Sequence, residues 1–282
     1  MTGIYKTEDG RLAIARRYRA QLDAWPVPRE EMRVPTAAGE TFVIASGPTD
    51  APALVLLHGS GANSGTWRGD IADWSAIFRV YAVDLPGEPG GSAPTRLPLD
   101  TDATASWFDE VCDALGLDSF ALVGMSLGGW TALDYVLRRP GRVNTLVLLC
   151  PGGLGRLRYG WLVRSVLARL VGTHSVREQA RTVLGLGDDP AAEDILDEVE
   201  LVFTHFSARS GTLPRFGAER LQEVDIPVLT IVGERDALFD AAQTAALARA
   251  GFRRGEVRLL PGIGHAVLGH TAAVREFVRA AG

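Results

Sequence analysis

The chain has 282 residues, 46% of them apolar, so we expect one or two domains with a sizeable core, and a disordered or fibrous protein is excluded. Its formal net charge is −5 and it has no dense basic run, which argues against a nucleic-acid partner. No apolar run reaches the ~18 residues that span a bilayer, and residues 1–25 lack the apolar stretch and cleavage site of a signal peptide. These features predict a soluble, cytoplasmic protein with no membrane partner.

The predicted elements alternate between strands and helices. Residues 1–30 are expected to form a helical arm, and from Glu31 onward short β-branched runs alternate with segments of helical period, which is typical of an α/β protein with a mostly parallel sheet. Thr41–Ala45 and Ala53–Leu57 are predicted to be an antiparallel pair. Continuous apolar runs predict strands in the centre of the sheet at Val80–Val83, Phe120–Val123, Thr145–Leu149, Val228–Val232 and Val257–Leu260.

Apolar residues recur at helical spacing in four further segments, which are Asp102–Leu115, Ser126–Arg139, Ala241–Ala250 and Ala266–Ala281. Residues 152–224 break the alternation, because they contain amphipathic helical stretches and no convincing strand. We therefore predict a core formed by residues 31–151 and 225–282, with 152–224 as a helical cap over the edge of the sheet. The cap could bury its apolar face on the core or on another subunit, which leaves a homo-oligomer open.

The sequence Gly124-Met125-Ser126-Leu127-Gly128 lies where a predicted buried strand runs directly into a helix. This is the nucleophile elbow, G-x-S-x-G in its expected strand-turn-helix setting. The turn strains the backbone of the serine, and the residues two before and two after it must be small to avoid collision. The hydroxyl of Ser126 is thereby held above the sheet as a candidate nucleophile.

A serine hydroxyl is a weak nucleophile at neutral pH, so a general base and a group that orients it are required. Asp236 follows the predicted strand 228–232 at the sheet edge where ligands gather, and it is the preferred acid. Glu234 is the competitor, and Asp240 is expected to cap the following helix.

His265 is the preferred base, because it follows the strand 257–260 in a loop where glycines on both sides of Ile263 permit a tight reversal. Among the other histidines, His58 is expected to hold its loop by hydrogen bonds, and His270 to lie within the last helix. His174 and His205 are interpreted as surface or cap residues. No pair of histidines has metal-ligand spacing beside a carboxylate, so we expect no metal and no cofactor.

Acyl transfer also needs donors for the developing oxyanion. The backbone N–H of Leu127 lies at the start of the helix after Ser126 and gains from the helix dipole. The second donor is expected from the glycine-rich turn His58-Gly59-Ser60-Gly61, and we assign it to the N–H of Ser60. The two cysteines, Cys112 and Cys150, lie in apolar segments and are predicted to be buried free thiols.

Together, five motifs resemble the α/β-hydrolase superfamily from Met32 to the C-terminus. They are Leu57–Gly59, Asp84–Gly87, Gly124–Gly129, Gly233–Asp236 and Gly264–His265. The order serine, acid, histidine along the chain is that of α/β-hydrolase triads. The resemblance implies an α/β-hydrolase fold and serine acyl-enzyme chemistry, with Ser126 as nucleophile, His265 as base and Asp236 as its partner.

Residues 43–58, 71–75 and 81–84 resemble more narrowly a bacterial carboxylesterase group that includes enzymes acting on bulky aryl-propionate esters. Because the resemblance weakens in the cap, it transfers no particular substrate. Apolar residues of the cap predict a lid over a small hydrophobic ester, although the same side chains are equally suited to form the cap's own core. They are Leu154, Leu157, Tyr159, Trp161, Leu162 and Phe203.

The preferred function is therefore hydrolysis of a carboxylic ester. Dehalogenases and epoxide hydrolases of the superfamily use an aspartate at the nucleophile position, and Ser126 argues against both. Hydrolases of C–C bonds and thioesterases share the serine motif and stay as alternatives. A small-molecule sensor or an accessory biosynthetic protein on the same fold is the alternative from a different class.

Overall fold

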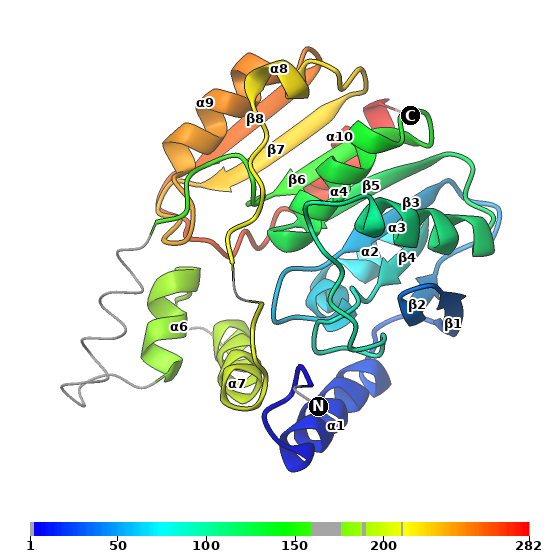
Figure 1. The fold of residues 1–282 in the computed structure, drawn as a ribbon, viewed down its shortest axis with the longest axis vertical. Coiled ribbons are helices and arrows are strands. Elements are labelled where there is room, and N and C mark those ends of the chain that lie inside the picture. Colours follow the sequence, from blue (N-terminus) through cyan, green and yellow to red (C-terminus); the bar gives the residue numbers. More distant parts are fainter. Residues whose placement is uncertain (1–2, 159–175, 188–189, 210, 282) are drawn as a thin grey trace.

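A computed structural model describes residues 3–158, 176–187, 190–209 and 211–281. An eight-stranded sheet runs through this part of the chain in the order β1-β2-β4-β3-β5-β6-β7-β8 (Figure 1). β2 is antiparallel to β1 and β4, and the other neighbours are parallel, as the α/β pattern predicts. The strands are β1 (Glu30–Thr36), β2 (Gly39–Ser46), β3 (Ala53–Leu57), β4 (Arg79–Val83), β5 (Phe120–Met125), β6 (Val143–Leu149), β7 (Val228–Gly233) and β8 (Gly255–Leu260).

The sheet differs from the predicted one in its strand pairing and its edges. The predicted antiparallel pairing of β2 with β3 is wrong, because β4 lies between them and pairs with both. β8, predicted in the centre, is an edge strand whose residues are exposed or half-buried. β1 was not predicted; its sequence EEMRVPT is polar, and Val34 is its one buried residue.

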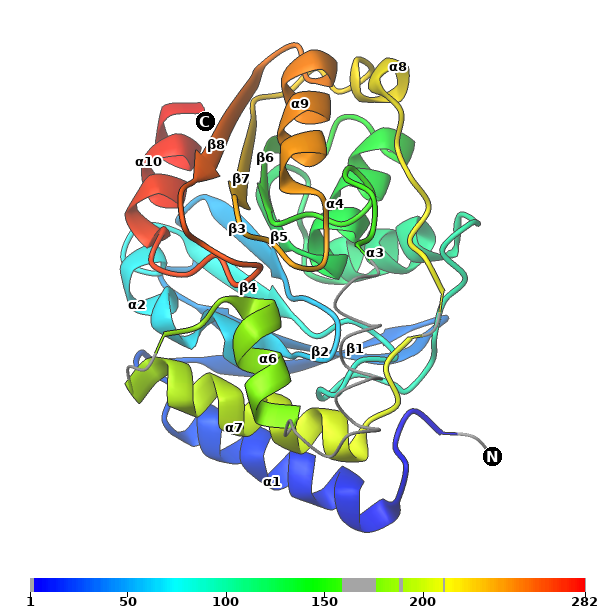
Figure 2. The ribbon, with the colours of Figure 1, turned by 90° about the vertical axis from the view of Figure 1, so that its left-hand side faces the viewer.

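Helices cover both faces of the sheet (Figure 2). On one face α3, α4 and α9 pack against the strands, and on the other η1, α2 and α10 do so. Their bounds are η1 (Ser64–Gly69), α2 (Ile71–Trp74), α3 (Ala103–Ala114), α4 (Leu127–Arg138), α9 (Ala241–Gly251) and α10 (Thr271–Ala281). No helix in the described ranges is long and apolar enough to cross a membrane.

The last helix begins later than predicted. α10 starts at Thr271 rather than Ala266, and Gly269 before it has a φ of +75°, a left-handed conformation that does not continue a helix. His270 therefore precedes the helix instead of lying within it, which corrects the prediction for that residue.

The N-terminal helix α1 (Glu8–Asp23) has a side-chain cap at its first turn. The side chain of Thr7 accepts a hydrogen bond from Gly10 N–H, as expected of an N-cap threonine. α7 (Pro190–His205) lies between α1 and α6 (Val176–Leu184) and packs against both, as Figures 1 and 2 show.

Apolar contacts and an ion pair between Arg17 and Asp194 join α1 to α7. Ile4 and Ile14 form one buried cluster with Val202 and Phe206. The short helix α8 (Ala218–Leu221), although it lies within residues 152–224, packs on α9 of the core instead. The predicted division into arm, core and cap stays a prediction.

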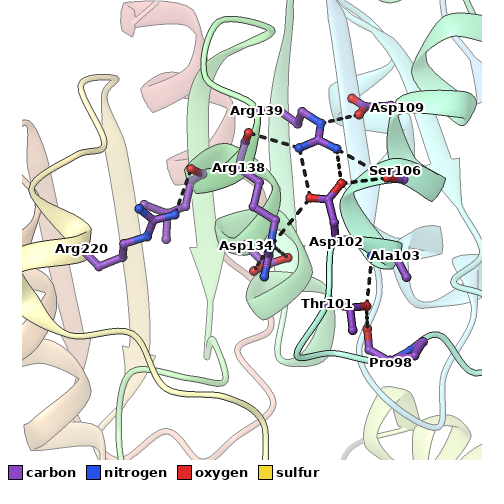
Figure 3. A network of polar contacts seen from close by, with 11 residues as sticks. Pro98, Thr101, Asp102, Ala103, Ser106, Asp109, Asp134, Arg138, Arg139 and Arg220 are labelled. Atoms are coloured by element: carbon purple, nitrogen blue, oxygen red, sulfur yellow. Dashed lines mark hydrogen bonds and ion pairs between the residues drawn. The ribbon is translucent and has the colours of Figure 1, made fainter.

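An ion-pair network ties α3 to α4 at the end of α4 opposite Ser126. Arg139 binds Asp102 and Asp109, and Arg138 binds Asp134 (Figure 3). A pocket of about 440 Å³ opens beside this network. Because Arg139 at the end of α4 pairs with Asp109 of α3 and with Asp102 just before α3, the network joins the two helices.

Candidate active site

Ser126 occupies the tight turn where β5 ends and α4 begins. Its backbone has φ 52° and ψ −109°, a conformation that residues with a side chain rarely adopt. Ser126 N–H donates to Leu149 O (2.9 Å), and Ser126 O accepts from Trp130 N–H (3.0 Å). The side chain makes no cap hydrogen bond to α4, so the hydroxyl is left for another partner.

Glycines flank this turn because no side chain fits there. A Cβ built at Gly124 would overlap Gly128 O and lie 2.7 Å from Gly129 Cα. One built at Gly128 would overlap Leu57 O on the neighbouring strand. The crowding that the pentapeptide motif predicts is therefore present on both sides of Ser126.

The structure brings three predicted site residues into one hydrogen-bonded chain. Ser126 Oγ lies 3.1 Å from His265 Nε2, and His265 Nδ1 lies 2.8 Å from Asp236 Oδ2. With a neutral imidazole, Nδ1–H donates to the carboxylate and Nε2 accepts from the hydroxyl. Asp236 is 1% exposed and His265 6%, so the imidazole is fixed in a nearly dry environment.

The carboxylate of Asp236 is held firmly in the loop after β7. Its Oδ1 accepts from Leu238 N–H (2.7 Å) and Phe239 N–H (3.0 Å), which leaves Oδ2 for the imidazole. Glu234, the competitor, is exposed and accepts a long hydrogen bond from a backbone N–H instead. Asp240 caps α9 through Gln243 N–H, as predicted.

The loop that carries His265 packs closely against two other segments. A Cβ at Gly233 would overlap Gly264 O, and a Cβ at Gly264 would lie 2.6 Å from Gly185 Cα, just after α6. Ala266 N–H also donates to Leu184 O (3.0 Å) at the end of α6. The position of the imidazole therefore depends on α6 as well as on the sheet.

Two opposing effects act on the pKa of His265. Burial lowers it, because the charged imidazolium is poorly solvated, whereas the neighbouring Cys150 and the hydrogen bond to Asp236 raise it. The net effect is a raised pKa of His265, to which the Asp236 carboxylate contributes by stabilising the imidazolium. A raised pKa makes His265 a stronger base toward a hydroxyl proton.

The glycine-rich turn after β3 lies beside Ser126. A Cβ at Gly59 would lie 3.5 Å from Ser126 Cβ, and the next residue, Ser60, is exposed. Within the described part of the chain, neither Ser60 N–H nor Leu127 N–H donates to a protein acceptor. Two backbone donors near the serine are thus unpaired.

His58 holds this turn, as predicted. Leu85 N–H donates to His58 Nε2 (2.9 Å), so the ring proton lies on Nδ1, which donates to Gly59 O (2.8 Å). Burial lowers the pKa of His58 and keeps the ring neutral. Both nitrogens are used, so His58 does not serve as a base.

Sequence reasoning missed two residues at the site. Glu88, in the loop after β4, is 1% exposed and accepts hydrogen bonds from Ser60 Oγ and Gly61 N–H. Cys150 has a φ of +40° beside the site. A glutamate in a turn carries no sequence signal of burial, and an apolar run gives no sign of the backbone strain at Cys150. The prediction that Cys112 and Cys150 are buried free thiols is confirmed.

Other candidate residues lie elsewhere. His205 ends α7, whereas His174 lies outside the described residues. Of the six proposed lid residues, Leu154 is buried in the core, Leu157 forms an isolated β-bridge with Phe239, and Phe203 is 50% exposed. The other three, Tyr159, Trp161 and Leu162, fall outside the described ranges. In the described ranges, no three His, Cys, Asp or Glu side chains gather in a way that could hold a metal ion.

A mostly parallel sheet with a serine in the strained turn between a central strand and the following helix defines the class of α/β hydrolases. Residues 52–269 match the family model described as alpha/beta hydrolase fold. The chain belongs to this family, and its similarity to carboxylesterases shows that it is a carboxylesterase-like hydrolase.

Carboxylesterase YbfK of Bacillus subtilis (strain 168) is 33% identical over 252 residues, which cover 87% of this chain and 82% of that protein. The crystal structure of carboxylesterase CesB (YbfK) from Bacillus subtilis matches with a TM-score of 0.81 at 29% identity, covering 97% of this chain and 98% of that one. The crystal structure of naproxen esterase (carboxylesterase NP) from Bacillus subtilis matches with a TM-score of 0.82 at 27% identity, covering 98% and 99%.

Proposed function

We propose that this protein hydrolyses carboxylic esters through an acyl-enzyme formed on Ser126. The observation that carries the proposal is the hydrogen-bonded chain from Ser126 through His265 to Asp236. Ser126 Oγ attacks the ester carbonyl while His265 Nε2 takes its proton, which then passes to the departing alkoxide. His265 next activates a water that cleaves the acyl-enzyme, and Asp236 orients the imidazole and stabilises its charge throughout.

The oxyanion of each tetrahedral intermediate is bound by the backbone N–H groups of Ser60 and Leu127. Both are unpaired within the described residues, and Leu127 lies at the N-terminus of α4, where the helix dipole favours negative charge. Donors of this kind each contribute about 10² to 10³ in rate in comparable enzymes.

A small hydrophobic ester is the substrate class that the surroundings favour. The ring of Phe239 lies 5.5 Å from the imidazole of His265, between ring centroids, and a Cβ at Gly152 would meet Phe239 and Leu213. The similarity to naproxen esterase supports the inclusion of a bulky aryl-propionate ester among the substrates to be tested.

The test is turnover of p-nitrophenyl acetate, butyrate and octanoate and of a naproxen ester by the wild type and by Ser126→Ala, with a fluorophosphonate label located by mass spectrometry. We expect turnover in the wild type alone and label on Ser126. Labelling without ester turnover would redirect the proposal to C–C bonds, thioesters or sensing, and absence of label would refute the nucleophile.

A further inference from the structure

Glu88 is a buried carboxylate that the reaction above does not use. Its Oε2 accepts hydrogen bonds from Gly61 N–H (2.7 Å) and Ser60 Oγ (3.2 Å), on the turn that carries the Ser60 N–H. Its Oε1 is also buried and has no partner among the described residues. Burying a carboxylate is costly, so a glutamate at this place calls for an explanation beyond the packing of a loop.

The turn after β3 and the loop after β4 are joined at both ends of the turn. At one end Leu85 N–H donates to His58 Nε2 (2.9 Å), and at the other Ser64 N–H donates to Asp84 Oδ1 (2.8 Å). The middle of the turn lies between these anchors. There, two side chains hold it within the described part of the chain: His58 Nδ1 donates to Gly59 O, and Glu88 accepts from Ser60 Oγ and Gly61 N–H.

The middle of the turn needs such a support. Gly61 has a φ of +69°, a left-handed conformation, and a Cβ there would meet only Val202 Cγ1, at 3.8 Å. Packing therefore does little to confine this backbone, and glycine is the most freely rotating residue. A hydrogen bond to a carboxylate is stronger than one between neutral groups, so the bond from Gly61 N–H to Glu88 holds the Ser60–Gly61 peptide, which adjoins the peptide that carries the Ser60 N–H.

We propose that Glu88 is a positioning residue of the oxyanion hole, which holds the Ser60 N–H toward the oxyanion that forms above Ser126. This inference rests on the proposed function. Burial raises the pKa of Glu88, while Arg96, Arg209 and the bond from Gly61 N–H oppose that rise. The two arginines also supply positive charge near a carboxylate that would otherwise repel the oxyanion.

Three substitutions separate position from charge. Glu88→Gln keeps an acceptor oxygen at the same reach, Glu88→Asp keeps the charge but retracts it, and Glu88→Ala removes the acceptor. The control is Asp134→Ala, which removes a carboxylate that is 5% exposed and paired with Arg138 at the far end of α4. The measurements are kcat and KM for p-nitrophenyl butyrate and the inhibition constant of phenylboronic acid, which forms a tetrahedral adduct on an active serine.

A misplaced oxyanion donor costs part of the ~10² to 10³ that its removal costs. We therefore expect Glu88→Ala and Glu88→Asp to lose about 10-fold or more in kcat with KM nearly unchanged, and phenylboronic acid to bind more weakly by a similar factor. Glu88→Gln and Asp134→Ala should keep both values close to wild type. If Glu88→Ala does not fold, the contrast between Asp and Gln decides.

Full kcat in the Asp and Ala variants, a loss of kcat without weaker boronate binding, or an equal loss in Asp134→Ala would overturn the role of Glu88. Fluorophosphonate labelling of the wild type distinguishes this result from a failure of the proposed function. A labelled Ser126 with unaffected Glu88 variants would refute the positioning role alone. An unlabelled Ser126 would refute both.

Discussion

Gly128 shows how closely single residues determine the site. A Cβ at this position would overlap Leu57 O, so Gly128→Ala is expected to push α4 away from β3. We predict a loss of about 1–3 kcal/mol or more in the free energy of unfolding, together with most of the ester turnover, because Ser126 would move relative to His265. Gly69→Ala, where nothing lies within 4 Å of the added Cβ, is the control. Urea denaturation and p-nitrophenyl butyrate turnover measure both effects, and a fully active Gly128→Ala would contradict the prediction.

The carboxylate of Asp236 determines the pH dependence. Neutral His265 is the form that accepts the hydroxyl proton, so turnover should rise with pH as the imidazolium loses its proton. Because a nearby negative charge raises the pKa of His265, Asp236→Asn should shift this rise to lower pH and lower the plateau by about 10⁴-fold.

The pH–rate profile of kcat/KM for a p-nitrophenyl ester tests this. Asp240→Asn makes the same chemical change four residues later, at a helix cap where asparagine also serves, so its profile should match the wild type. A rise displaced to higher pH in Asp236→Asn, or an equal loss in Asp240→Asn, would refute the assignment.

The positions of Ser126, Asp236 and His265 could be predicted because each follows a strand of a mostly parallel sheet, and the carboxyl ends of such strands meet at one edge. Glu88 could not be predicted in the same way. Its burial depends on a contact between the loops after β3 and β4, which no local pattern records.

A buried apolar cluster holds α1 and α7 together. Phe206, just after α7, is 3% exposed and packs with Ile4, Ile14 and Val202, whereas Phe203, one turn earlier, is 50% exposed. Phe206→Ala should lower the free energy of unfolding of the contact between α1 and α7 by about 3–5 kcal/mol. Phe203→Ala should lower it by less than about 0.5 kcal/mol. Hydrogen exchange of both helices should accelerate in Phe206→Ala alone; equal exchange in the two variants would show that this cluster does not join them.

Strand pairing was the least predictable aspect of the elements. β2 and β3 follow each other through a turn, yet β4 inserts between them, because pairing is decided by contacts distant in sequence. The apolar run of β8 resembles that of a central strand, but β8 lies at the edge of the sheet. Its residues are exposed or half-buried there.

Over the whole molecule, α1 packs against the sheet through buried side chains of its second half. Tyr18, Leu22 and Trp25 lie in the same buried cluster as residues of β2, β3 and β5. The hydroxyl of Tyr18 also donates to Asp84 (3.1 Å), the carboxylate that anchors the turn after β3. Unfolding of α1 is therefore expected to be part of one cooperative transition with the sheet.

A pair of leucines on α1 tests this cooperativity. Leu22 is 3% exposed and Leu12 is 40% exposed, so Leu22→Ala should lower the free energy of unfolding by about 2–5 kcal/mol and Leu12→Ala by less than about 0.5 kcal/mol. Urea denaturation followed by circular dichroism reports on the helices. Tryptophan fluorescence reports on the buried clusters on both faces of the sheet, since Trp25, Trp67 and Trp74 lie in one and Trp107 in the other. Both signals should shift together in Leu22→Ala, because loss of α1 uncovers the sheet. An early loss of helical signal with an unchanged fluorescence midpoint would instead show that α1 folds separately from the core.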